Sequence, residues 1–122
     1  MSGLRHRDQA GGRWWELSLS EQLGNIGSEV SRAAHWQFRN PELSRSALYR
    51  ALELFDLTFD DERHRKSRPR LREIARAREV VADFFAGPNQ YGSTAASLQK
   101  YFDAYAVAAR ASRRPPGDQA SG

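Results

Sequence analysis

The chain has 122 residues, no cysteine, and a formal net charge of +4 from 19 basic and 15 acidic residues. This length fits one domain with one core, and the lack of cysteine excludes disulfides, thiolate metal sites and thiol nucleophiles. No apolar run reaches the roughly 18 residues that cross a bilayer, and the first residues carry no apolar stretch. We therefore expect a cytoplasmic protein with no membrane span and no secretory signal.

The two ends of the chain differ from its middle. Residues 1–13 are polar with a glycine pair, and residues 111–122 carry Pro115, Pro116 and Gly117. Such segments bury too little apolar surface to offset the entropy lost on ordering. We expect two disordered tails around a helical domain over residues 14–110.

The first two helices are predicted from their caps and apolar stripes. Ser18 and Glu21 form a capping box, and apolar residues then recur every three or four positions to about Arg39. Asn40 can cap a second helix from Pro41 to about Phe59, because proline suits the first helical position. The acidic residues 60–62 that follow are unfavourable at a helix C-terminus and are interpreted as its stop.

The third and fourth helices complete the prediction. Pro69 opens the third, and Gly87 closes it as a left-handed cap before Pro88. Ser93 or Thr94 can cap the fourth. No stretch alternates like a strand, so we expect an all-α protein, an antiparallel up-down-up-down four-helix bundle with short connections. Long arm-like helices that pack only on assembly are the alternative.

A face of small residues on the first helix is not explained by its apolar stripe. This face includes Gly24, Gly27, Ser28 and Ser31. Glycine inside a helix costs about 1 kcal/mol relative to alanine, so a compensating contact is expected. We interpret the face as a helix–helix contact, within the bundle or between subunits, although tolerated exposed glycines are the simpler alternative.

A basic cluster lies between Glu62 and Arg78. It contains eight basic and two acidic residues, so this window carries +6 and the rest of the chain about −2. Arginine pairs with phosphate in a bidentate manner, and a cluster attracts an anionic polymer. We predict binding of RNA or DNA by Arg63, Arg65, Lys66, Arg68, Arg70, Arg72 and Arg76. An acidic protein partner or an ordinary solvated surface are the alternatives.

The remaining residues form none of the common catalytic or metal-binding motifs. The chain has no helical Glu-x-x-His pair, no phosphate-binding loop and no nucleophile elbow. The acidic residues 60–62 with His64 could hold a cation, but a helix end that carries acids is the commoner case. We expect no enzyme activity, no cofactor and no metal, with a helical nuclease that uses His35 or His64 as a remote alternative.

The segment Asn25-Ile26-Gly27-Ser28-Glu29 resembles the Asn-Ile-Ala-Glu-Gly-type segment of small bacterial four-helix-bundle proteins. These are the proteins encoded in ribosomal-RNA intervening sequences and the related accessory variability determinants of diversity-generating retroelements. The resemblance implies a ring-shaped homo-oligomer, a pentamer, whose positive surface engages RNA and a reverse transcriptase without catalysis of its own.

These observations lead to one functional prediction and one rival. We expect a non-enzymatic, self-associating accessory protein that binds nucleic acid, RNA preferred. The rival is a protein–protein adaptor without nucleic-acid binding, which would use Trp14, Trp15 and the glycine face as contacts.

Overall fold

The computed structural model describes residues 12–112, and every regular element in this range is helical. After a helical turn at residues 12–14, the elements are α2 (Leu19–Trp36), α3 (Pro41–Phe59), α4 (Glu62–Arg65), α5 (Arg68–Ala86) and α6 (Ala95–Ser112). The expectation of an all-α protein is confirmed for this part of the chain. Most of the two predicted tails lies outside the described residues, but residues 111 and 112 belong to α6.

The predicted helix starts rest on local capping and are observed. The Ser18 hydroxyl accepts from the Glu21 N–H at 3.1 Å, and the Glu21 carboxylate accepts from the Ser18 N–H at 2.9 Å. The Asn40 side chain caps α3, whose first residue is Pro41. Of the two candidate caps for α6, it is Thr94 that accepts from the Ser97 N–H, at 3.0 Å.

One helix boundary and one cap conformation differ from the prediction. The first helix ends at Trp36 instead of Arg39, before a turn that leads to Asn40. Gly87 is extended, with φ −104° and ψ −167°, and is not a left-handed cap. A Cβ there would lie 3.1 Å from the Asp83 Cα, so close packing explains the glycine. The left-handed residues of the following loop are Asn89 and Gly92.

The acidic residues 60–62 do more than end the second helix. Asp60 is the C-cap of α3, but Asp61 is the N-cap of the one-turn helix α4, with its carboxylate 3.0 Å from the Arg63 N–H. Acidic groups are favourable at a helix N-terminus. The start of the basic segment therefore forms a helix of its own, α4.

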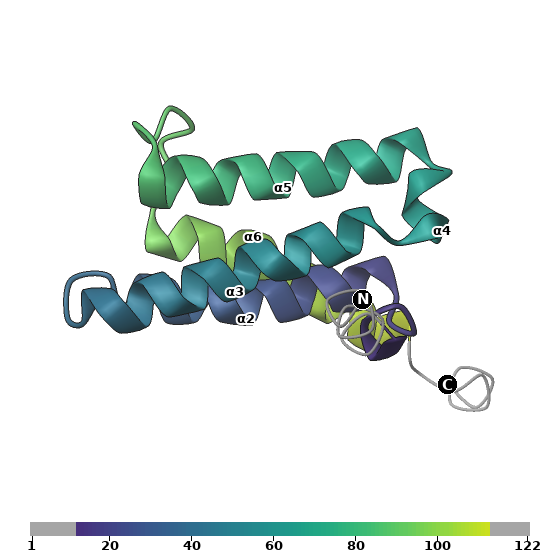
Figure 1. Ribbon diagram of the computed structural model, residues 1–122, viewed down its shortest axis with the longest axis horizontal. Coiled ribbons are helices and arrows are strands. Elements are labelled where there is room, and N and C mark those ends of the chain that lie inside the picture. Colours follow the sequence, from purple (N-terminus) through teal and green to yellow (C-terminus); the bar gives the residue numbers. More distant parts are fainter. Residues whose placement is uncertain (1–11, 113–122) are drawn as a thin grey trace, which may run out of the picture.

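Helix α2 has its most extensive contacts with α3 and α6, and Figure 1 shows it beside α3. Helix α5 lies along α3, and α4 joins these two helices at one end. All four long helices contribute to one core of fully or almost fully buried side chains. Its members include Leu23, Ile26, Val30, Ala51, Phe55, Ile74, Ala77, Val81, Leu98 and Phe102.

The small-residue face of α2 lies against α6. A Cβ at Gly27 would collide with the Cβ of Phe102, and one at Gly24 would lie 3.3 Å from the Ala106 Cα. The two glycines thus permit close approach of the two helices, which compensates their low helix propensity. Ser31 is half-buried on this side of the helix, and Ser28 is exposed.

Within residues 12–112, no helix combines the length and the apolar character that crossing a bilayer requires.

Candidate nucleic-acid interface

The seven basic residues predicted to bind phosphate lie on α4, on the turn after it and on the first half of α5. Arg63 and Arg65 belong to α4, Lys66 is its C-cap, and the other four belong to α5. The structure divides them into two groups. Arg63 bonds to a buried polar cluster although its side chain is 44% exposed, whereas the others extend from the surface, and of these Arg70 alone contacts that cluster.

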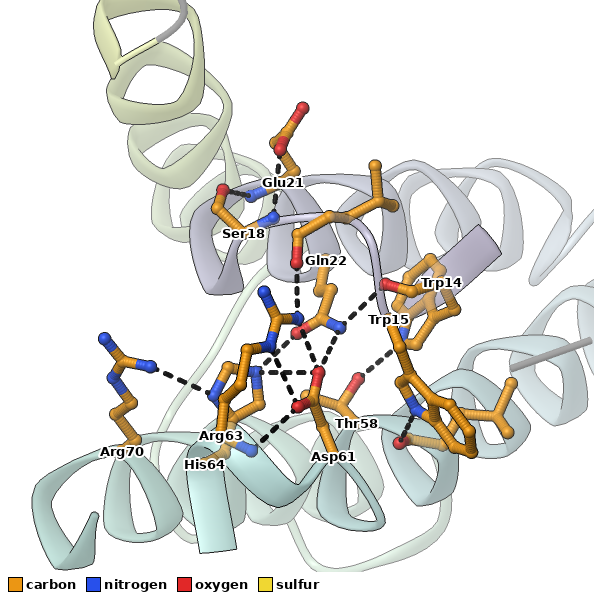
Figure 2. Close-up of polar contacts among 12 residues, drawn as sticks. Trp14, Trp15, Ser18, Glu21, Gln22, Thr58, Asp61, Arg63, His64 and Arg70 are labelled. Atoms are coloured by element: carbon orange, nitrogen blue, oxygen red, sulfur yellow. Dashed lines mark hydrogen bonds and ion pairs between the residues drawn. The ribbon is translucent and has the colours of Figure 1, made fainter. Parts of the chain in front are cut away.

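Arg63 is held by acceptors within the protein (Figure 2). Its Nη2 lies 2.6 Å from Asp61 Oδ2 and donates to the Leu17 carbonyl at 2.6 Å, and its Nε donates to Asp61 Oδ1 at 3.0 Å. The hydrogen bond to Asp61 raises the pKa of Arg63 above its ordinary value. This side chain therefore fastens α4 to the segment before α2, and two of its nitrogens are already engaged.

Asp61, Gln22 and His64 form the centre of the buried polar cluster, and all three are at most 3% exposed. The Gln22 amide nitrogen donates to Asp61 Oδ2 at 3.1 Å and to the Trp14 carbonyl at 3.0 Å. Its amide oxygen lies 2.7 Å from His64 Nε2 (Figure 2). Each buried polar group thus has a partner, as the cost of burying it requires.

These contacts determine the state of His64. Because the Gln22 oxygen can only accept, Nε2 of the imidazole must carry a proton, which leaves Nδ1 as the acceptor. Arg70 Nη1 lies 3.5 Å from that Nδ1. Burial lowers the pKa of His64, although Asp61 acts in the opposite direction. The ring is therefore neutral near pH 7, in the tautomer with the proton on Nε2.

Asp61 carries the compensating negative charge. Burial alone would raise its pKa, but hydrogen bonds from the Arg63 side chain, from Gln22 and from the Arg63 backbone outweigh burial and lower the pKa to about 2. The carboxylate is therefore ionised at neutral pH, and its two oxygens are occupied by the neighbouring side chains.

The two tryptophans before α2 close the same end of the molecule. Trp14 is only 8% exposed, and its indole N–H donates to Thr58 Oγ1 at 2.9 Å. The Trp15 indole N–H donates to the Leu57 carbonyl at 3.1 Å. Trp14 is thus a core residue, and the rival prediction that it serves as an exposed adaptor contact is wrong.

The outer basic row consists of Arg65, Lys66, Arg68, Arg72 and Arg76, which are all exposed. Among the described residues, none of the five has a carboxylate within 4.0 Å. An ion pair between Arg76 and Glu73, three residues apart on α5, would be typical of an ordinary solvated helix face, and it is among the pairs that are not formed. Arg70 is exposed beside the row, next to His64, while Arg78 lies 3.9 Å from Asp56.

Of the residues considered for catalysis or metal binding, Asp61 and His64 lie close together, with 3.6 Å between Asp61 Oδ2 and His64 Nε2, but both belong to the buried polar cluster. His64 is fully buried, and His35 is an exposed residue at the other end of α2, with its ring against Trp36. Asp61 is occupied by Arg63 and Gln22. Over residues 12–112, no group of three or more potential ligands is placed to hold a metal ion.

Sequence reasoning missed Gln22, Thr58 and the inward direction of Arg63. Gln22 lies beside the apolar stripe of α2, where a polar residue gives no sign of burial, and its partners are about 40 residues away. The one usable signal was Asp61 followed by Arg63, because an aspartate just before a short polar segment is typical of a helix N-cap.

Comparison with known proteins does not add a family to this geometry. No protein-family model, no curated protein and no solved structure matches the chain.

Proposed function

We propose that this protein is a non-enzymatic nucleic-acid-binding protein, with RNA as the preferred ligand and the outer basic row as its contact surface. We also propose that its four long helices form an antiparallel up-down-up-down bundle and that the protein self-associates in the cytoplasm. The preference for RNA, a pentameric ring and a reverse-transcriptase partner rest on the resemblance at residues 25–29 alone. The DNA-binding and RNA-binding forms of the proposal share the same phosphate contacts.

The observation that carries the proposal is the exposure of five basic side chains without carboxylate partners, beside a polar cluster that holds their backbone in place. Ion pairing within the protein would neutralise this charge, but in the described chain the acids nearby are used elsewhere or lie beyond 4.0 Å. Phosphates are the ligands that such a surface attracts, with the release of counterions.

The spacing along α5 supports a linear polyanion as the ligand. Arg68, Arg72 and Arg76 are four residues apart, so they lie on one side of the helix with about 6 Å between successive positions along its axis. Arg65 and Lys66 continue the charge beyond the helix start. The row therefore offers several phosphate contacts in succession instead of one anion site.

The test is a fluorescence-anisotropy titration of labelled structured RNA and duplex DNA at low and near-physiological salt. We expect an affinity that falls steeply with salt for the native protein. The triple variant Arg65→Glu, Lys66→Glu, Arg68→Glu should lose binding while its melting temperature is unchanged, because these side chains make no buried contact. A matched control, Arg45→Glu, Arg50→Glu, Arg110→Glu, reverses three exposed charges away from the row.

The outcomes separate the proposal from its rival. Loss of binding in the first variant and retention in the control supports the basic row. Unchanged affinity in the first variant contradicts it. Absence of RNA and DNA binding by the native protein at low salt would leave the adaptor as the better hypothesis.

One observation favours the adaptor or self-association as a second candidate. Phe38, in the turn between α2 and α3, is 91% exposed, and Leu43 nearby is 45% exposed. Exposed aromatic residues are frequent anchors of protein interfaces. Because Gly24 and Gly27 are already used against α6, this end of the molecule is the better place for such a contact. Light scattering of the Phe38→Ser variant against native protein measures whether it holds subunits together.

A further inference from the structure

An open groove lies beside α5, on the side where the outer basic row leads toward the loop before α6. Its volume is about 740 Å³. One wall is Phe59 of α3, and the far end is closed by the loop that carries Tyr91. The α5 side of the groove is formed by Ala75, Arg78, Glu79 and Ala82. The lining also includes Asp83, so the groove is mainly apolar, with two carboxylates and one guanidinium.

The groove and the basic row share one side of α5. From Arg72, steps of three and four residues lead to Ala75, Glu79 and Ala82. Residues at this spacing are neighbours on a helix surface. A chain whose phosphates lie on Arg68, Arg72 and Arg76 thus passes the mouth of the groove, roughly 10 Å from Arg72 along the axis to Glu79.

The loop that carries Tyr91 is held in a defined shape. The Asp83 carboxylate accepts from the backbone N–H of Gln90 at 2.9 Å and of Tyr91 at 3.1 Å. Asn89, with φ 55°, exchanges two hydrogen bonds of 2.9 Å with the backbone of Ser93. Tyr91 nevertheless remains 46% exposed. The backbone that carries Tyr91 is therefore held in place, and its ring is accessible to a ligand.

We propose that the groove holds one unstacked nucleobase of a single-stranded nucleic acid whose phosphates lie on the outer basic row, with Tyr91 as the stacking residue. This inference rests on the proposed function and deepens it. Single strands are bound by a positive surface that follows the backbone together with aromatic side chains that stack on the bases. Along α5, the outer basic row supplies the positive surface, and the groove with Tyr91 supplies the aromatic side chain.

Glu79 selects among bases in this arrangement. A carboxylate accepts from an exocyclic amino group, such as N4 of cytosine. Uracil has a carbonyl oxygen at the same position, which a carboxylate repels. Partial desolvation and, after it, the nearby Glu79 carboxylate raise the pKa of Tyr91, so its hydroxyl keeps its proton at neutral pH. The groove therefore favours cytosine over uracil.

The experiment compares four versions of the full chain in anisotropy titrations: native, Tyr91→Leu, Tyr91→Phe and Glu79→Gln. The ligands are labelled oligocytidylate, oligouridylate and an RNA duplex of equal length. Tyr91→Leu should weaken oligocytidylate binding at least about fivefold, since stacking is lost, and should leave duplex binding unchanged because paired bases are not available. Tyr91→Phe keeps a ring and should retain the affinity.

The base preference gives a second readout. Native protein should bind oligocytidylate about fivefold more tightly than oligouridylate, the effect of one good contact, and Glu79→Gln should remove most of that ratio. Glu79→Gln also removes a negative charge, which should raise the affinity for oligocytidylate and for oligouridylate equally. The ratio of the two affinities cancels this effect and reports the base contact alone. Equal binding of the two strands by native protein would overturn the role of Glu79.

Ultraviolet cross-linking of oligocytidylate to the protein tests directly whether a base lies beside Tyr91. The tryptic peptide of residues 79–100 contains Tyr91 as its sole tyrosine and no internal lysine or arginine. A cross-link on this peptide that is lost in Tyr91→Leu supports the groove. Oligocytidylate binding that Tyr91→Leu does not change, or weakens as much as duplex binding, overturns it. Different results would contradict the proposed function itself: nucleic-acid binding that persists in the triple variant of Arg65, Lys66 and Arg68, or no binding by the native protein.

Discussion

Arg63 and Arg65 are two residues apart on the same short helix and are both exposed, yet only Arg63 is bonded to acceptors within the described part of the protein. Arg63 bonds to Asp61 and to the Leu17 carbonyl, in contact with the buried cluster of Gln22, Asp61 and His64. Arg65 is exposed and has no carboxylate within 4.0 Å in the described chain. One run of charged residues thus contains a structural half and a surface half. The density of charge in the sequence does not distinguish the two halves. The side of the helix from which each residue extends does.

The largest expected effect concerns the structural half. Asp61→Ala removes the N-cap of α4 and the partner of Arg63 and of Gln22. We expect the free energy of unfolding to fall by about 3 kcal/mol, measured by urea denaturation, because a buried charged network loses its central member. The exposed neighbour variant Glu62→Ala should change it by less than about 0.5 kcal/mol. Similar losses in both variants would remove the distinction between the two halves.

The next effect is the dependence of stability on pH. The pKa of His64 is lowered on folding, so the unfolded chain binds its proton first and stability falls as the pH drops below about 6.5. The pKa of Asp61 drops from 3.8 to about 2, so its contribution, about 2 kcal/mol, is complete above pH 3.8 and is lost between 3.8 and 2.

Melting temperatures measured from pH 7.5 to 2 test this dependence. In the His64→Gln variant the decline below pH 6.5 should be reduced, since an amide can still donate to Gln22 without titrating. His35→Gln serves as the control, because His35 is exposed, with its ring against Trp36. A decline that depends on His35 and not on His64 would contradict the buried neutral imidazole.

The smallest effect on stability is expected in the surface half. Arg72→Gln should change the free energy of unfolding by less than about 0.5 kcal/mol. In nucleic-acid titrations it should lower the slope of log affinity against log salt by about 1, the share of one phosphate contact. Arg45→Gln, on α3, should leave that slope unchanged. A stability loss above 1 kcal/mol for Arg72→Gln would place it in the structural half.

Much of the fold was predictable because its signals are local. Ser18 with Glu21, and Asn40 with Pro41, determine two helix starts from neighbouring residues, and the bounds of α3 agree with the prediction. The four-residue helix α4 was missed because it is too short to show an apolar period. Gly87 was assigned the wrong conformation: it is extended, and the contact that excludes a Cβ there is with Asp83, one turn earlier in the same helix.

The candidate site was predictable only as a charged segment. The residues of the outer row were identified by their density in the sequence, and their exposure agrees with a surface role. The inward direction of Arg63 and the burial of His64 depend on Leu17 and Gln22, about 40 residues earlier in the chain. The groove at Tyr91 likewise depends on Phe59, a residue of another helix.

The sequence by itself determined that this chain is helical, where its main helices begin, and that one segment concentrates positive charge. Caps, apolar periods and charge counts are properties of neighbouring residues, so they can be read without knowing the fold. The tertiary structure alone decided which charges of that segment face inward and that Gly24 and Gly27 meet α6. These outcomes depend on contacts between residues far apart in the chain, and only packing of the helices brings those residues together.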